Sequence, residues 1–423
     1  MAICPPNLAS LVPIEAKNYR DSMRSESDFR SRSLQWISVT LIWILSIPPL
    51  HAYDSERGRI PIDFVPWEAE EGVRRIYSIA ETSEGYLVAA NGDVGLFDGD
   101  RVELLPMPST TYTGATSVDS EGNIWVGNSN DMGFFQRDDF GKWVYHSIRQ
   151  YLPPEVEIDL VWAVHCLRQT VYFVTSHRLL IWRNQTFELV DLPTQRRLFS
   201  TEHDGACYVW QRQGLIEKPG ADIDWHVRLW KFDAEGNRTL LVERFEELSS
   251  WDVFQDDEMG LGFMLEDSRR VQLNNGNWDE SAGSGLPRVP ISVHRLNDND
   301  CLVGTVNEGV VWIKPDGTLR WHVGIVDEEL PDDSVEATLV TSQGKFWGVT
   351  PRGLIGLQSN PAITYWSRSD GARGTINAIL RWNHHLLLGT ADGMFRVAPG
   401  DDGKMAKITK YRDAAFGEIV YDL

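Results

Sequence analysis

The clearest pattern along the chain is a series of short apolar runs separated by Gly, Asn and Asp. Residues 74–105 contain four such runs, at 75–82, 86–90, 94–97 and 101–105. The segments between the runs read Ser-Glu-Gly, Asn-Gly-Asp and Asp-Gly-Asp, which are typical of tight turns between antiparallel strands. The pattern therefore predicts a four-stranded antiparallel unit whose strands are joined by hairpins.

The same order of runs and turns recurs along the chain. A second unit has its first turn at residues 119–123, and six further units begin near Val161, Leu198, Trp251, Ile291, Ala337 and Ile376. The equivalent second-strand positions, about 43 residues apart on average, are Ala90, Gly127, Val174, Trp210, Phe263, Gly304, Val349 and Gly389. That period is typical of a propeller blade. The sequence predicts an all-β fold, a β-propeller of about eight four-stranded blades over residues 53–423, with seven blades as the alternative.

A glycine is predicted to open the third strand in six of the eight units, because a tight turn before a strand often needs a positive φ angle. These glycines are Gly95, Gly133, Gly214, Gly309, Gly353 and Gly393. The fourth unit is the longest. We interpret its extra length as an additional hairpin around Trp225 to Glu243 that turns at residues 234–237.

Residues 1–52 predict an export signal. Arg24, Arg30 and Arg32 precede an uncharged stretch from Ser33 to Ala52, and Ala52 is a small residue suited to cleavage. An uncleaved N-terminal anchor is the alternative, although the apolar core is shorter than the roughly 20 residues that span a bilayer. The basic region before the core is long, so the true start is expected at Met23. We expect an exported, periplasmic or extracellular chain with no membrane span after cleavage.

Charge then limits the classes of partner. The chain has 40 Lys and Arg against 61 Asp and Glu, a net charge of −21. After Ala52, 35 basic and 57 acidic residues remain, so the acidity belongs to the predicted propeller. Because affinity for nucleic acid depends on basic residues that displace counterions, this composition argues against a nucleic-acid partner.

The cysteines give no sign of a disulfide framework or a metal site. Cys166, Cys207 and Cys301 follow the signal, and each lies among apolar neighbours, so we expect buried free thiols. No spacing of Cys and His residues suggests zinc. We predict no cofactor and no metal.

The second unit carries a recognisable motif in Asp119-Ser-Glu-Gly-Asn-Ile-Trp-Val-Gly127. This segment resembles the two-component regulator propeller repeat, as do residues 83–88, 95–99 and 388–395. In that family the propeller is the extracytoplasmic sensor of a bacterial signalling protein, and a Tyr-rich module, a membrane helix and an output domain follow it. Only 13 residues follow Lys410 here. We interpret the chain as a stand-alone sensor-like propeller or as a truncated sensor.

Several groups of residues are candidates for a binding or metal site. Trp125, Trp347 and Tyr172 fall on second strands and are interpreted as core between blades, not as a platform for sugars. His384-His385 is interpreted as a surface turn without a third metal ligand. Residues Asn297–Asp300 lack the Gly and Glu of a calcium loop, and Asp327–Asp333 is interpreted as a solvated loop.

No catalytic motif is present, so catalytic residues are predicted to be none and the ligand-binding residues stay unknown. The leading hypothesis is a non-catalytic propeller that senses a ligand, with an oligosaccharide implied by the resemblance, or that binds an envelope protein or a separate signalling partner. The alternative is an exported polysaccharide lyase or glycosidase, since fold does not determine function. A third interpretation is a scaffold for envelope assembly. We expect ligand contacts in loops that do not repeat.

Overall fold

The computed structural model divides the chain into two units, Met1–Ser55 and Glu56–Leu423. All described residues belong to the second unit, so the predicted export signal lies outside them. The structure describes residues 58–411 except 67–77, 92, 106, 108–112, 195–197, 216–223, 247–249, 257–259, 266–269, 275–276, 280–289, 296–299, 315–318, 325–329, 331–333, 359–362, 367–369, 372, 384 and 399–405.

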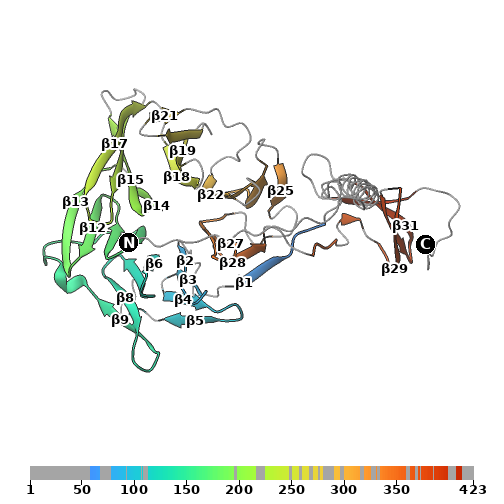
Figure 1. Cartoon of the computed structure of the whole chain (residues 1–423), viewed down its shortest axis with the longest axis horizontal. Coiled ribbons are helices and arrows are strands. Elements are labelled where there is room, and N and C mark those ends of the chain that lie inside the picture. Colours follow the sequence, from blue (N-terminus) through green and yellow to red (C-terminus); the bar gives the residue numbers. More distant parts are fainter. Residues whose placement is uncertain are drawn as a thin grey trace, which may run out of the picture. The chain divides into compact units, whose positions relative to one another are not determined.

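In this described part, the strands form eight four-stranded sheets in which neighbouring strands are antiparallel (Figure 1). Blade 1 consists of β2 (Ile79–Glu81), β3 (Leu87–Asn91), β4 (Asp93–Phe97) and β5 (Val102–Leu105). Blade 2 consists of β6 (Thr113–Val118), β7 (Ile124–Asn128), β8 (Met132–Arg137) and β9 (Trp143–Ser147). Blade 3 consists of β10 (Ala163–Leu167), β11 (Thr170–Val174), β12 (Arg178–Arg183) and β13 (Thr186–Asp191).

The next blades follow the same order. Blade 4 consists of β14 (Phe199–His203), β15 (Ala206–Leu215), β16 (Asp224–Phe232) and β17 (Arg238–Glu246). Blade 5 consists of β18 (Ser250–Asp256), β19 (Gly260–Leu265), β20 (Arg270–Asn274) and β21 (Asn277–Asp279). Blade 6 consists of β22 (Pro290–Arg295), β23 (Cys301–Thr305), β24 (Val310–Ile313) and β25 (Leu319–Val323).

Blade 7 is completed by a strand from the other end of the propeller sequence. It consists of β26 (Ala337–Val340), β27 (Lys345–Thr350) and β28 (Gly353–Gln358), and its fourth strand is β1 (Ile62–Pro66). β1 pairs with β28 in an antiparallel register that places Ile62 opposite Leu357 and Pro66 opposite Gly353. The first described strand therefore closes the seventh blade.

The seven blades pack in a closed cycle. The first strand of each blade contacts the first strand of the next, from β2 against β6 through to β22 against β26, and β26 in turn packs against β2 of blade 1. Apolar clusters fill these interfaces. One of them joins Leu87 and Phe97 of blade 1 to Trp347 and Val349 of blade 7. The ring is therefore closed both by backbone pairing of β1 with β28 and by burial of apolar surface between blades 7 and 1.

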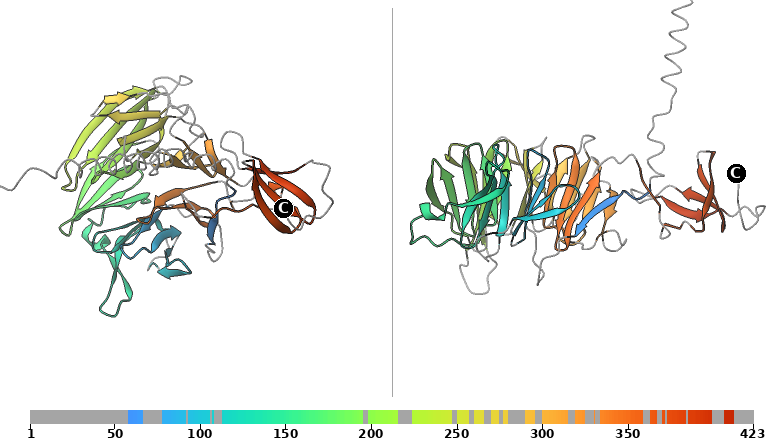
Figure 2. Two further views of the ribbon diagram at one scale, coloured as in Figure 1. Left: turned by 45° about the vertical axis from the view of Figure 1, so that its right-hand side comes forward. Right: turned by 90° about the horizontal axis from the view of Figure 1, so that it is seen from below.

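The eighth sheet consists of β29 (Ile376–Trp382), β30 (His385–Thr390), β31 (Gly393–Ala398) and β32 (Lys407–Lys410), drawn in red in Figure 2. Its main buried cluster comprises residues from 388 to 408 with Trp366 against it. Among the described residues, the strands β29 to β32 pack extensively against one another, and none of them packs extensively against a strand of a blade. About eight four-stranded units are confirmed, and seven of them form the cycle.

The repeat motif of blade 2 is a self-contained turn. Asp119 Oδ1 accepts hydrogen bonds from the backbone N–H groups of Glu121 and Asn123, both at 2.9 Å. Asp119 Oδ2 accepts from Asn123 Nδ2 at 2.9 Å and from Trp125 Nε1 at 2.7 Å. Gly122 has a φ of 85°, which a glycine adopts without strain. The Asp, Gly, Asn and Trp of the motif are thus explained by one hydrogen-bonded turn.

All eight predicted second-strand positions lie on the second strands of their sheets, as expected. The third-strand glycines are only partly as predicted. Gly309, Gly353 and Gly393 do have positive φ angles of 69°, 153° and 114°. At Gly133 the reason is close packing, because an added Cβ would lie 2.2 Å from the carbonyl oxygen of His146.

The fourth unit requires a correction. Gly214 does not open the third strand. It lies within the ten-residue β15, opposite Trp225 of β16. The hairpin around Trp225 to Glu243 is not additional, because it is formed by β16 and β17, the third and fourth strands of the blade. Long strands, and not an inserted hairpin, make this unit the longest.

Candidate functional site

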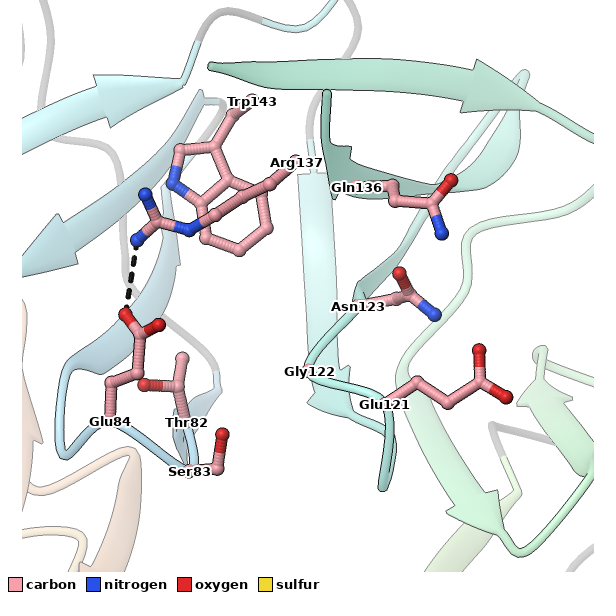
Figure 3. A pocket seen from close by; sticks show the side chains of 9 residues that line it. All are labelled: Thr82, Ser83, Glu84, Glu121, Gly122, Asn123, Gln136, Arg137 and Trp143. Atoms are coloured by element: carbon pink, nitrogen blue, oxygen red, sulfur yellow. Dashed lines mark hydrogen bonds and ion pairs between the residues drawn. The ribbon is translucent and has the colours of Figure 1, made fainter. Parts of the chain in front are cut away.

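A polar pocket of about 230 Å³ lies between blades 1 and 2 (Figure 3). It is built by three turns, the β2–β3 turn of blade 1 and the β6–β7 and β8–β9 turns of blade 2. Its lining residues are Thr82, Ser83, Glu84, Glu121, Gly122, Asn123, Gln136, Arg137 and Trp143. Apart from Trp143 and Gly122, each contributes a polar or charged side chain.

Two of the three turns have the same local sequence, Ser-Glu-Gly. In blade 1, the N–H of Gly85 donates to the carbonyl of Thr82 at 2.9 Å, and the N–H of Tyr86 donates to Thr82 Oγ1 at 3.1 Å. In blade 2, the Asp119 carboxylate holds the corresponding turn. These internal bonds fix both backbones, so Glu84 and Glu121 project from rigid turns.

Arg137, at the end of β8, links the two blades across the pocket. Its Nη2 donates to Glu84 Oε2 of blade 1 at 3.1 Å, and its Nη1 donates to the carbonyl of Gly141 at 3.1 Å. Its guanidinium carbon lies 4.6 Å from the ring centroid of Trp143. Because both charged partners are largely exposed, the ion pair contributes at most about 1 kcal/mol to stability. The main role of this ion pair is to hold the Arg137 guanidinium in place across the pocket.

The two sides of the pocket differ in chemistry. Figure 3 shows Gln136, Asn123 and Glu121 on the side opposite Glu84 and Arg137. Asn123 is buried, and its side-chain amide N–H donates a hydrogen bond to Asp119, so its side chain is held in a fixed orientation in the pocket lining. The pocket offers hydrogen-bond donors in Arg137 and Gln136, acceptors in the Glu carboxylates, and apolar surface in the indole of Trp143.

A second set of polar contacts joins the first strands of neighbouring blades. Ser78, just before β2, lies 2.9 Å from Thr116 of β6 through their hydroxyl oxygens. His165 Nε2 of β10 lies 2.8 Å from Ser200 Oγ of β14, and His294 Nε2 of β22 lies 2.7 Å from Thr338 Oγ1 of β26. We call these the inner-strand contacts. They fix the blade interfaces beside the apolar clusters.

Burial shifts several pKa values near the inner-strand contacts. It lowers the pKa of His165 to about 4, so this ring is neutral at pH 7. Partial desolvation raises the pKa of Glu202 on β14 to about 7, although this residue is exposed at the surface. Burial also raises the pKa of the Cys166 and Cys207 thiols well above the usual range. These thiols are therefore protonated and unreactive at neutral pH.

The three aromatic residues of the second strands, Trp125, Trp347 and Tyr172, are core residues, as predicted. Trp125 and Trp347 expose only 7% and 5% of their surface, and Tyr172 is fully buried. Trp125 packs on Phe134, with ring centroids 4.7 Å apart. Cys207 is a buried free thiol, as expected, and Cys166 is a half-buried one. Cys301 is half-buried in β23.

Of the acidic and histidine candidates, only Asp300 and His385 lie among the described residues. Asp300 is buried and accepts a hydrogen bond from Trp312 Nε1 at 2.6 Å, while residues 297–299 lie outside the described residues. The acids of Asp327–Asp333 and His384 also lie outside them, and His385 is half-buried on β30. In the part of the chain that the structure describes, no group of three His, Cys, Asp or Glu residues is arranged to hold a metal ion.

Sequence reasoning did not identify the pocket. That ligand contacts lie in loops that do not repeat stays a prediction, and this pocket is lined by two copies of a repeated turn. The signal in the sequence was the recurrence of Ser-Glu-Gly at residues 83–85 and 120–122. Arg137 and Trp143 flank the Asp138-Asp139 turn, and only the fold brings Arg137 to Glu84.

Solved structures show which known fold the chain shares. The extracellular domain of the one-component system BT4673 of B. thetaiotaomicron is 16% identical over 86% of this chain and 48% of that chain, with a TM-score of 0.52. The extracellular domain of the hybrid two-component system BT3049 of the same organism is 14% identical over 82% and 49%, with a TM-score of 0.56. Virginiamycin B lyase of Staphylococcus aureus is 10% identical over 71% and 100%, with a TM-score of 0.52.

The chain is a β-propeller. The resemblance to sensor propellers of two-component regulators is confirmed at the level of fold by the two extracellular domains. This propeller chain spans about half the length of those domains. No protein-family model and no curated protein matches it. Among its described residues, no helix is long and apolar enough to cross a membrane.

Proposed function

We propose that this β-propeller is the exported, non-catalytic ligand-sensing part of a signalling system and that it binds a short oligosaccharide between blades 1 and 2. The observation that carries the proposal is the polar pocket, which is built on two rigid turns from different blades. The similarity to extracellular domains of signalling systems supports the sensing role.

The lining of the pocket suits a sugar. Each sugar hydroxyl both donates and accepts a hydrogen bond, and the pocket supplies both kinds of partner around one indole. The C–H face of a sugar ring packs on such an aromatic surface. The ion pair of Arg137 with Glu84 keeps the net charge of the pocket low, which favours a neutral polyol over a strongly charged ligand.

A ligand in this pocket acts on the interface between two blades. Glu84 belongs to blade 1 and Arg137 to blade 2, and they are joined by one exposed ion pair. A ligand that binds Arg137 more tightly than Glu84 does would favour a different spacing of the two turns. Such a shift depends on the difference in affinity for the two arrangements. The neighbouring faces would then present a changed surface to a partner protein.

We also propose export and cleavage after Ala52, and the support is the basic region and uncharged stretch of residues 24–52. Mass spectrometry of the protein recovered from the periplasm or medium is expected to begin close to Tyr53. An intact Met1 or Met23 in exported protein would contradict cleavage and favour the uncleaved anchor.

Binding is tested by calorimetry of the exported protein against a panel of neutral oligosaccharides. Gln136→Ala and Trp143→Ala are expected to weaken binding by roughly tenfold or more, since each removes a direct contact. Arg101→Ala is the matched control, because Arg101 is an exposed, ion-paired residue of blade 1 outside the pocket.

Two results would overturn the proposal. The first is that no oligosaccharide binds and no partner protein is retained by the exported chain. The second is the release of cleavage products from a polysaccharide, which would replace sensing by the alternative of an exported lyase or glycosidase.

A further inference from the structure

The carboxylate of Glu121 is the charge in the pocket that has no partner. Glu84 is paired with Arg137 at 3.1 Å. Among the described residues, the side chain of Glu121 takes part in no hydrogen bond or ion pair, and only its backbone N–H is bonded, to Asp119. Glu121 lines the side of the pocket opposite the ion pair (Figure 3). That side of the pocket therefore carries a negative charge that no cation of the described chain balances.

The turn itself does not need this carboxylate. The first turn of blade 7, residues 341–344, has Gln343 at the position equivalent to Glu121. In both turns the N–H of the glycine donates to the carbonyl three residues earlier, at 2.8 Å in blade 7 and 3.1 Å in blade 2. The φ angles of Gly344 and Gly122 are 77° and 85°. A neutral amide is thus compatible with the turn, and the fold gives no reason for a charge at Glu121.

The neighbours of Glu121 add oxygen acceptors. Figure 3 shows the side chains of Glu121, Asn123 and Gln136 one above another and extending away from the ion pair. Asn123 uses its Nδ2 to bond Asp119, so its Oδ1 remains as an acceptor. A primary ammonium group carries three N–H donors and no acceptor. A negative charge beside two amide oxygens therefore suits an ammonium group better than it suits a carboxylate.

We propose that the oligosaccharide bound between blades 1 and 2 carries a free amino group, as a deacetylated amino sugar does, and that its ammonium group pairs with Glu121. The inference rests on the proposed function, because it names the class of sugar that the same pocket selects. The charged lining residues are Glu84, Glu121 and Arg137, two carboxylates and one guanidinium, with a net charge of −1. One ammonium group neutralises this excess, whereas the carboxylate of a uronic acid would add to it.

The charge of the whole chain acts in the same direction. After Ala52, 35 basic and 57 acidic residues remain, a net charge of −22. A field of this sign attracts cations, and salt screens the attraction. Close to the pocket, the carboxylate of Asp119 lies behind Asn123, which it bonds at 2.9 Å. Both the local and the overall charge therefore favour a cationic sugar over an anionic one.

The test is calorimetry with pairs of oligosaccharides that differ only in an amino group or a hydroxyl on the second ring carbon. Chitobiose with cellobiose is one pair, and the galactosamine and galactose counterparts are another. At about pH 5.5 the carboxylates are ionised and the amines are protonated. We expect the amino form of a pair to bind about fivefold more tightly, the size of effect that one exposed ion pair gives.

Two variants assign the preference to a residue. Glu121→Gln is expected to bind the two forms equally and to keep its affinity for the neutral form, because Gln343 shows that the turn accepts glutamine. Glu103→Gln is the matched control. Glu103 is an exposed residue of β5 outside the pocket, so this variant changes the net charge by the same amount and should keep the full preference.

The outcomes separate this inference from the proposed function. Equal binding within each pair, or tighter binding of the neutral form, overturns the inference and leaves the proposed function in place. A preference that Glu84→Gln abolishes and Glu121→Gln retains overturns the assignment to Glu121. Equal loss in Glu103→Gln and Glu121→Gln would mean that only the overall charge acts, which also overturns it. Binding of no sugar in either form overturns the proposed function, and the inference with it.

Discussion

The turn at Asp119 gives a sharp test of how the repeat motif stabilises a blade. Asp119→Ala removes the acceptor of four hydrogen bonds, one of which comes from the indole N–H of the buried Trp125. An unsatisfied buried donor costs about 1–3 kcal/mol. Loss of the side-chain cap on the turn adds about 1 kcal/mol. We therefore expect a loss of about 2–4 kcal/mol in the free energy of unfolding.

The assay is urea unfolding followed by circular dichroism, with Asp98→Ala as the matched control. Asp98 also caps a turn through two backbone N–H groups, but it holds no buried indole, so its loss should be smaller. Adding Trp125→Phe to Asp119→Ala removes the unsatisfied donor and should restore part of the stability. Equal losses for Asp98→Ala and Asp119→Ala, or no recovery in the double variant, would refute the role of the indole.

Three further predictions concern titration, backbone strain and a buried ion pair. Burial lowers the pKa of His165 from about 6.5 to about 4 in the folded chain. The unfolded chain therefore binds a proton more readily, so the free energy of unfolding is unaffected above about pH 6.5 and falls by up to about 3 kcal/mol as the pH drops towards 4. Melting temperatures between pH 7 and 4 should show a smaller acid-side decrease in His165→Gln. Gly309→Ala should lower the melting temperature more than Gly141→Ala, because both have positive φ but only at Gly309 would a Cβ meet a carbonyl oxygen, at 2.0 Å. Arg59→Met should cost about 3–5 kcal/mol in urea unfolding, since it leaves buried Asp370 without the guanidinium that bonds it at 2.8 Å; Asp370→Leu in the same chain should recover much of this.

The repeated part of the fold was predictable because its determinants are local. A turn such as residues 119–123 contains its own hydrogen-bond partners, so the sequence identifies it without knowledge of the rest of the chain. The same holds for the second strands, which lie between two hairpin turns.

Features that depend on distant residues were missed. The pairing of β1 with β28 joins Ile62 to Leu357, and no local pattern indicates that partner. Gly214 was misplaced because its strand continues past the point where other blades turn. The pocket was missed for the same reason, since Arg137 and Glu84 meet only when blades 1 and 2 pack together.

The closure of blade 7 by β1 has a consequence for how the chain folds. Blades 1 to 6 each use strands that follow one another, so their hairpins form soon after the residues emerge. β1 precedes all of them and must wait for β28, nearly 300 residues later. Such distant pairing is slow, because the chain loses loop entropy before any contact compensates for it. Ring closure is therefore expected as a late, single step, and a variant that weakens only the β1–β28 pairing should slow refolding while leaving the earlier hairpins intact.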